Sequence, residues 1–192
     1  MQGNLFSAEA LGTTRPADLP LQPQQLQDWQ QRIHSHQASL FRGERPQTQQ
    51  ASLFDRGDGD PAVQLDPLSL TPLPLTFWRW PDSPHQGAAI YLVLDRPSAL
   101  EHPLLLYVGE TGAADRRWKG DHDCKAYLSA YGEALQRCGL DHQLSIRFCT
   151  DVPAQTRARR QLEQALIQRW QPPFNKETRQ RWATPFHADL DA

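Results

Sequence analysis

The chain has 192 residues, enough for one domain of common size with an appendage, because single domains cluster at about 100–150 residues. Its hydrophobic fraction of 39% is below the globular norm of about 45–50%, and its 16 prolines and 21 glutamines indicate that part of the chain does not fold compactly. The formal net charge of −2 argues against a strongly basic nucleic-acid coat, and no run of residues is apolar and long enough to predict a membrane span or a signal peptide.

The charge is unevenly distributed along the chain. Residues 1–87 carry 6 basic and 9 acidic groups, whereas residues 88–182 carry 14 basic and 11 acidic groups. Arginine supplies 17 of the 20 cations, which suits bidentate contacts with phosphate. The C-terminal half therefore permits a nucleic-acid partner without requiring one.

Residues 1–84 are predicted to form a largely flexible arm rich in Gln and Pro. Residues 1–75 hold 8 of the prolines and 12 of the glutamines, with no sustained apolar period. One short helix is expected at about 23–35, where Leu26, Trp29 and Ile33 have helical spacing after Pro23. Prolines are too frequent for a helix between residues 58 and 84, so residues 73–80 are expected to be extended and to dock on the following domain.

Residues 85–182 are predicted to form a compact domain, followed by a C-terminal tail at 183–192. Apolar runs at 89–94 and 104–109 predict a hairpin with a long loop, and the alternation at 144–149 predicts a third strand. Helical patterns occupy residues 113–119, 125–138 and 154–170, and Pro172-Pro173 must end the last one. The expected fold class is α+β, with a small three-stranded antiparallel sheet flanked by helices.

Five short elements follow one another in this domain: Ala89-Ile90-Tyr91, Tyr107-Val108-Gly109, Arg117, Leu162-Glu163-Gln164 and Pro172-Pro173-Phe174-Asn175. In this order the set resembles the GIY-YIG endonuclease superfamily, and its last element is similar to the nuclease module of the bacterial excision-repair incision subunit. The resemblance covers about residues 88–176. It implies a GIY-YIG-like fold with Tyr91, Tyr107, Arg117 and Glu163 as catalytic residues, one divalent metal on Glu163, and supporting roles for Gly109 and Asn175.

Phosphodiester hydrolysis gives each of these residues a chemical reason to be present. Arg117 offers a guanidinium fork for a phosphate oxygen, and Glu163 is a hard oxygen ligand for one Mg²⁺. Tyr91 and Tyr107, on neighbouring antiparallel strands, can share a face and hold or deprotonate the attacking water. A tyrosine with a pKa near 10 needs a nearby cation for this role, and which tyrosine acts stays open.

Each residue also has a purely structural interpretation. The two tyrosines fit ordinary strand positions, Arg117 fits a solvated turn, and Glu163 can pair with a neighbouring arginine of its helix. Asn175, after two prolines, fits a local turn. His122 follows Arg117 by five residues and is an accessory candidate whose alternative is a solvated surface histidine.

Two residues depart from the pattern of the superfamily. Ala89 stands in place of the first glycine, which removes backbone freedom but no functional group. Glu110 directly follows the second motif, where an acidic group weakens phosphate binding unless it faces away or meets the metal.

The three cysteines, Cys124, Cys138 and Cys149, cannot all pair within the chain and lack zinc-ligand spacing. Reduced thiols and a cytoplasmic location are therefore expected, without zinc.

The N-terminal arm carries three copies of the pattern Gln-x-(Asn/Ser)-Leu-Phe. This pattern resembles the pentapeptide that bacterial polymerases and repair proteins insert into the sliding DNA clamp, which implies the clamp as a partner. The alternative is a duplicated pentapeptide that packs on the domain through Leu and Phe. The candidate partner-binding residues are Gln2, Leu5, Phe6, Gln37, Leu40, Phe41, Gln50, Leu53 and Phe54.

The sequence thus predicts a Mg²⁺-dependent endonuclease that hydrolyses DNA phosphodiester bonds, directed by DNA structure in repair or recombination. The preference for structure over sequence rests on analogy, because so small a domain has no evident second recognition module. Two alternatives remain: a catalytically degenerate domain that only binds nucleic acid, and a clamp-associated adaptor acting through the repeated pentapeptides.

Overall fold

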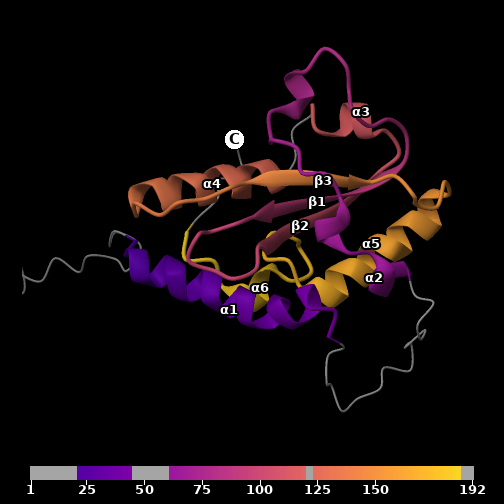
Figure 1. The fold of residues 1–192 in the computed structure, drawn as a ribbon. Coiled ribbons are helices and arrows are strands. Elements are labelled where there is room, and N and C mark those ends of the chain that lie inside the picture. Colours follow the sequence, from indigo (N-terminus) through magenta and orange to yellow (C-terminus); the bar gives the residue numbers. More distant parts are fainter. Residues whose placement is uncertain (1–20, 45–60, 120–122, 187–192) are drawn as a thin grey trace, which may run out of the picture.

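The computed structural model of the chain describes residues 21–44, 61–119 and 123–186. Helices surround one small sheet, as Figure 1 shows. In chain order the elements are α1 (Pro23–Phe41), α2 (Pro61–Gln64), the 3₁₀ turns η3 (Pro67–Ser69) and η4 (Phe77–Arg79), β1 (Ala89–Asp95), β2 (Leu104–Thr111), α3 (Ala114–Arg117), α4 (Asp123–Arg137), β3 (Ser145–Cys149), α5 (Thr156–Trp170) and α6 (Arg179–Trp182).

The sheet confirms the predicted α+β class. Its three strands are antiparallel in the order β2-β1-β3, so the first strand lies in the centre and is buried along its whole length. The predicted hairpin of β1 and β2 is present, and a bulge interrupts its register between Val93 and Leu94.

Side chains of β1 alternate between two apolar layers, as a strand buried on both faces requires. Tyr91 and Val93 belong to the layer that contains Tyr131 and Leu135 of α4. The opposite layer contains Ile90, Leu92 and Leu94 together with Leu166, Ile167 and Trp170 of α5. The sheet is therefore covered on both faces.

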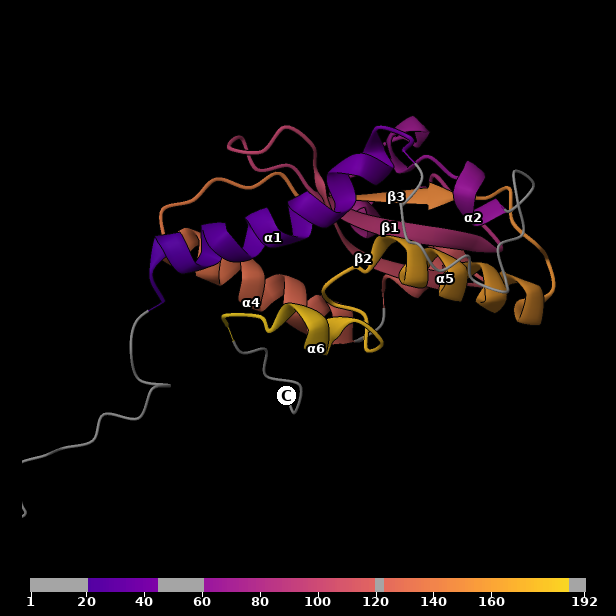
Figure 2. The ribbon, with the colours of Figure 1, turned by 90° about the horizontal axis from the view of Figure 1, so that it is seen from below.

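Helix α1 corrects the prediction of a largely flexible arm at residues 1–84 for residues 23–41. The helix predicted at about 23–35 continues to Phe41, and Leu26, Trp29 and Ile33 are fully buried in the layer shared with α4. Figure 2 shows α1 running beside the sheet, with α4 next to its N-terminal half. Composition was misleading here because α1 has few apolar residues, yet Leu26, Trp29 and Ile33 lie on one face and are fully buried.

Residues 61–84 also pack on the domain, as predicted for part of them, although residues 77–79 form a 3₁₀ turn instead of an extended segment. Leu73 pairs with Ile146 of β3, and Phe77 is buried against Phe148. The buried Arg147 donates hydrogen bonds of 2.9, 3.2 and 3.0 Å to the carbonyls of Pro67, Leu68 and Leu70. One arginine of β3 thereby fixes a proline-rich segment that sequence periodicity could not place.

Strand β2 is an edge strand whose outward backbone groups are hydrogen-bonded by other elements. The Gln37 side chain of α1 accepts from Leu105 N at 2.8 Å and donates to the carbonyls of Leu105 and Trp170 at 3.0 Å each. The Phe174 N–H donates to Leu106 O at 3.0 Å. These contacts replace a fourth strand and cover the edge.

The same edge continues with two residues from the predicted site. Asn175 Oδ1 accepts from Val108 N at 3.0 Å, and its Nδ2 donates to Val108 O at 2.8 Å. Glu163 Oε1 accepts from Glu110 N at 3.0 Å. Both side chains are therefore fixed to the strand that carries Tyr107.

The domain extends past the predicted boundary at residue 182. The Phe186 ring packs on Trp29, Tyr131 and Phe174, with centroid separations of 5.6, 5.8 and 6.1 Å. Residues 183–186 therefore belong to the fold, because aromatic contacts from three elements hold Phe186. Within the described ranges, no helix has the length and hydropathy needed to cross a membrane.

Candidate active site

The two tyrosines of the predicted site share a face of the sheet. Tyr91 lies opposite Gly109 in the register of β1 and β2, so Tyr107 is its diagonal neighbour. Their ring centroids are 5.9 Å apart and the ring planes are inclined by 29°. Tyr91 is fully buried and Tyr107 is half-buried, so Tyr107 is the more accessible of the two.

Arg117 is brought to the tyrosines by α3, the short helix that directly follows β2. Its Nε donates to the Tyr91 hydroxyl at 3.3 Å. Among the described residues, no hydrogen bond or ion pair engages the two terminal nitrogens of this arginine. Arg117 therefore presents its fork beside the tyrosine hydroxyls, in keeping with the predicted phosphate contact.

Gly109 is required by the position of Tyr91. A Cβ atom built at Gly109 would overlap the Tyr91 phenol ring and hydroxyl. The glycine of the Tyr-Val-Gly motif thus makes room for the tyrosine of the neighbouring strand, a steric role that the sequence motif did not reveal.

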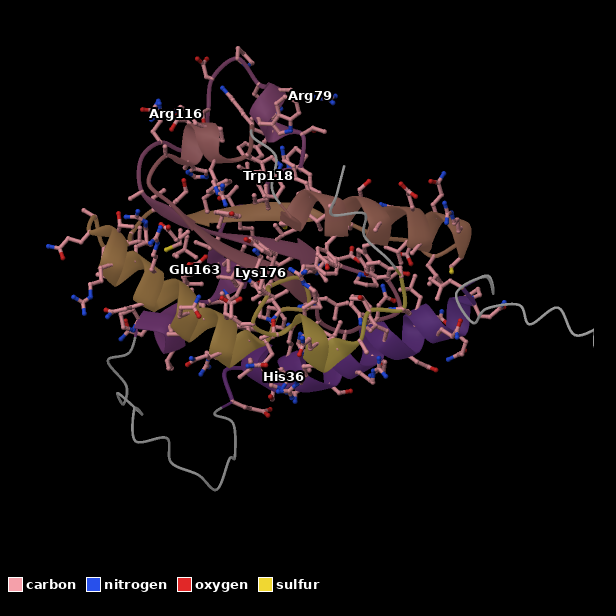
Figure 3. All side chains as sticks on the ribbon, turned by 180° about the vertical axis from the view of Figure 1, so that it is seen from behind. His36, Arg79, Arg116, Trp118, Glu163 and Lys176 are labelled. Carbon is pink, nitrogen blue, oxygen red and sulfur yellow. The ribbon has the colours of Figure 1, made fainter. Side chains whose placement is uncertain are left out.

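Glu163 lies on the second turn of α5 and is half-buried beside β2 (Figure 3). Its Oε1 is held by the Glu110 N–H, whereas Oε2 makes no hydrogen bond or ion pair with the described residues. Burial raises the pKa of Glu163 to about 7; the Glu110 N–H lowers it, and the carboxylates of Glu110 and Glu177 raise it. Arg160 also lowers this pKa by its charge but makes no hydrogen bond or ion pair with Oε2, so burial outweighs it.

Glu110, the residue that departed from the expected pattern, is neutralised by two arginines of α5. Arg159 Nε lies 2.8 Å from Glu110 Oε2, and Arg160 Nε lies 3.3 Å from Oε1. Arg159 is 3% exposed and also donates to the carbonyls of Pro153 and Ala154. The predicted conflict between Glu110 and a phosphate is removed, because the carboxylate is turned into these ion pairs.

Burial also determines the protonation of the tyrosines. It raises the pKa of Tyr91, and the charge and hydrogen bond of Arg117 oppose this rise. Burial likewise raises the pKa of Tyr107, and the neighbouring Tyr91 adds to the rise. Both hydroxyls are therefore protonated at neutral pH in the metal-free protein, and Tyr91 is the one that Arg117 favours as an anion.

The donor set fits one hard cation that retains most of its waters. In the described parts of the chain, no group of three or more His, Cys, Asp or Glu side chains forms a metal-binding cluster. Glu163 Oε2, an oxygen of a half-buried carboxylate whose other oxygen is held by the Glu110 N–H, is the ligand that the site offers. Mg²⁺ is commonly bound in this way, through one or two carboxylates together with phosphate and water.

The other predicted site residues have different positions. Asn175 is 4% exposed, and both of its amide atoms bond to Val108, so its role is to hold β2. His122 lies outside the described residues. All three cysteines are free thiols, as expected.

The middle pentapeptide copy packs on the domain, as the structural alternative predicts. Gln37 is fully buried on the edge of β2, Leu40 is 6% exposed, and the Phe41 ring packs on Trp170 with centroids 4.6 Å apart. Its candidate residues are helical, with Gln37 and Leu40 buried and Phe41 half-buried, so this copy is not an extended, exposed peptide. The other two copies, at Gln2, Leu5, Phe6 and at Gln50, Leu53, Phe54, lie outside the described residues.

Sequence reasoning missed the residues that support the site. Arg159 was considered only as a helix partner of Glu163, yet it neutralises Glu110 of β2. The sequence gives no role to Trp118, whose ring lies 5.9 Å from that of Tyr91 in an edge contact. No periodicity could reveal these contacts, because they join separate elements.

Comparison with known proteins assigns no family to the chain. No family model, no curated protein and no solved structure matches it.

Proposed function

We propose that this protein is a GIY-YIG-type endonuclease that hydrolyses DNA phosphodiester bonds with one Mg²⁺, directed by DNA structure in repair or recombination. The observation that carries the proposal is the convergence of four side chains from separate elements. Tyr91 of β1 contacts both Tyr107 of β2 and Arg117 of α3, and Glu163 of α5 is hydrogen-bonded to Glu110 N of β2. These contacts support the proposal.

Each side chain has a defined task in this chemistry. Arg117 binds a non-bridging phosphate oxygen and offsets the charge that develops on phosphorus. The Tyr107 hydroxyl, the more accessible one, orients the attacking water, and the Tyr91 hydroxyl accepts the hydrogen bond from Arg117. Glu163 Oε2 would hold the Mg²⁺, which when bound supplies Lewis-acid polarisation of the phosphate.

The supporting contacts explain why the geometry is maintained. Gly109 leaves space for the Tyr91 ring, Asn175 fixes the backbone of Val108, and the arginines of α5 neutralise Glu110. All three act on β2 within three residues of Tyr107, where a displacement of the strand would misalign the hydroxyl.

The test is Mg²⁺-dependent cleavage of a panel of supercoiled, flap, fork and four-way-junction DNA. Arg117→Ala and Glu163→Gln are each expected to reduce cleavage by about 100- to 1000-fold. Glu163→Gln keeps an oxygen for the Glu110 N–H while removing the charge, and Arg137→Ala, on the exposed end of α4, is the matched control. Equal cleavage by wild type and both site variants would refute the proposal.

The same panel separates the two alternative functions. A degenerate site that only binds nucleic acid predicts no cleavage by wild type and unchanged DNA binding by both variants. A clamp-associated adaptor predicts a function that does not depend on Arg117 or Glu163. One of the three motif copies that this function would use is packed on the hydrophobic core.

A further inference from the structure

Two tryptophans are exposed on the 3₁₀ turn before the sheet. Trp78 is 37% exposed and Trp80 is 44% exposed. Of the large hydrophobic residues in the described ranges, only Val63 shares this degree of exposure. Two indoles at least one-third exposed thus lie within three residues of the chain, and exposed aromatic side chains of this size are candidates for a binding role.

The turn that carries them is fixed on both sides. Phe77 is 2% exposed and packs edge-on against Phe148 of β3, with centroids 5.3 Å apart. Trp118 Nε1 donates to Leu75 O at 3.2 Å, which ties the turn to the end of α3. Because residues of a 3₁₀ turn point about 120° apart, burying Phe77 directs Trp78 to the outside. The indoles are therefore presented by a rigid base.

The surroundings of the indoles are predominantly cationic. The guanidinium of Arg79 lies 5.1 Å from the Trp78 ring centroid, and the Lys125 Nζ lies 6.0 Å from the same ring. Arg116 of α3 has 79% of its side chain exposed, and its contact with Asp115 is a loose 3.8 Å ion pair. Figure 3 shows Arg79 and Arg116 on the same side of the sheet. Among the described residues at 76–84 and 114–119, the exposed charged groups are basic at Arg79, Arg116, Arg117 and Lys119 and acidic at Asp82, and Asp115 is partly exposed.

A chain of contacts links this surface to the candidate active site. Lys125 Nζ lies 5.8 Å from the Trp118 ring, and Trp118 contacts Tyr91 edge-on. The residue before Trp118 is Arg117, which donates to the Tyr91 hydroxyl. The side chains of Lys125 and Trp118 thus lie between Trp78 and Tyr91, a separation that a strand of nucleic acid can span.

We infer that Trp78 and Trp80 stack on unpaired bases of the DNA substrate, so that the enzyme prefers DNA with a single-stranded segment beside the cleavage point. The inference rests on the proposed nuclease function and names its substrate class. Bases in a duplex cover one another's faces, whereas an unpaired base offers its face to an indole without regard to sequence. Arg79, Lys125 and Arg116 place positive charge where the phosphates flanking a stacked base would lie.

The test measures DNA binding in EDTA, so that it is independent of cleavage. The probes are a fluorescent 12-nucleotide oligo-dT and a fully paired hairpin duplex. A variant with both Trp78→Ala and Trp80→Ala is expected to bind oligo-dT about tenfold more weakly and to bind the duplex within about twofold of wild type. Replacing both tryptophans by Phe is expected to restore most of the oligo-dT affinity, and Val63→Ala is the control for loss of an exposed apolar side chain.

Three results would overturn the inference: unchanged oligo-dT binding by the double Ala variant, an equal loss for oligo-dT and duplex, or an equal loss in Val63→Ala. If the nuclease proposal fails but the stacking inference holds, wild type will cut no DNA in Mg²⁺, while its binding to oligo-dT will still depend on Trp78 and Trp80. Because both indoles are exposed, the thermal midpoint of the double variant is expected to match that of wild type, which separates binding from folding.

Discussion

Replacing Gln37 by Ala would test whether helix α1 is an integral part of the domain. The substitution leaves one buried donor, Leu105 N–H, and two buried acceptors, Leu105 O and Trp170 O, without the Gln37 amide. A buried polar group without a partner costs about 1–3 kcal/mol, and the lower end for each of three groups gives about 3 kcal/mol. This is a large fraction of the 5–15 kcal/mol that typically stabilises a protein, yet small enough for the variant to fold.

The measurement is urea unfolding followed by circular dichroism, together with thermal denaturation. A loss of about 3 kcal/mol corresponds to a fall in Tm of about 6–12 °C for a chain of this size. Gln31→Ala is the matched control, because Gln31 is an exposed glutamine of the same helix and its loss is expected to change stability by about 0.5 kcal/mol or less. Equal stability of the two variants would refute the docking of α1 on β2 and restore the picture of a flexible arm.

Three further predictions concern the site. Gly109→Ala forces the new methyl group against the Tyr91 phenol and is expected to destabilise the fold by about 1–3 kcal/mol and abolish cleavage. Mg²⁺-dependent cleavage is expected to fall about tenfold for each pH unit below 7, because protonation removes the Glu163 charge when its pKa is about 7. Without metal, the contribution of Glu163 to stability is full below about pH 4.5 and is lost as the pH rises through about 7. Glu110→Ala removes the partner of a buried arginine and is expected to cost about 3 kcal/mol in chemical denaturation.

Each of these predictions has a control and a contradicting result. Gly112→Ala should be tolerated, because its new Cβ would meet nothing nearer than an arginine nitrogen at 3.6 Å; equal damage from both glycine variants would contradict the steric role. A Glu163→Gln protein whose unfolding free energy followed the pH profile of wild type would exclude Glu163 as the titrating group. Glu133→Ala breaks only an exposed ion pair on α4. If it lowered the unfolding free energy as much as Glu110→Ala does, the buried ion pair would not be the more stabilising of the two.

The core of the fold and the identity of the candidate site residues could be inferred from the sequence. The apolar runs at 89–94 and 104–109 required a sheet because β-rich segments without charges must be buried, and the helical spacing of Leu26, Trp29 and Ile33 predicted the helix that contains them. Arg117 and Glu163 were selected by the resemblance of the ordered motifs to the GIY-YIG superfamily, and side-chain chemistry supplied only a reason for a cation and a carboxylate near phosphate.

Only the tertiary structure determined which residues from distant parts of the chain are in contact. From the sequence, Glu110 is expected to repel a phosphate, whereas the fold places Arg159 and Arg160 beside it. From the sequence, Gln37 belongs to a motif that binds a partner, whereas its amide is hydrogen-bonded to the edge of β2. The physical reason is that both facts depend on contacts between elements far apart in the chain. Local periodicity specifies which face of an element is apolar, whereas the partner of a buried charge or amide is fixed by how those faces pack.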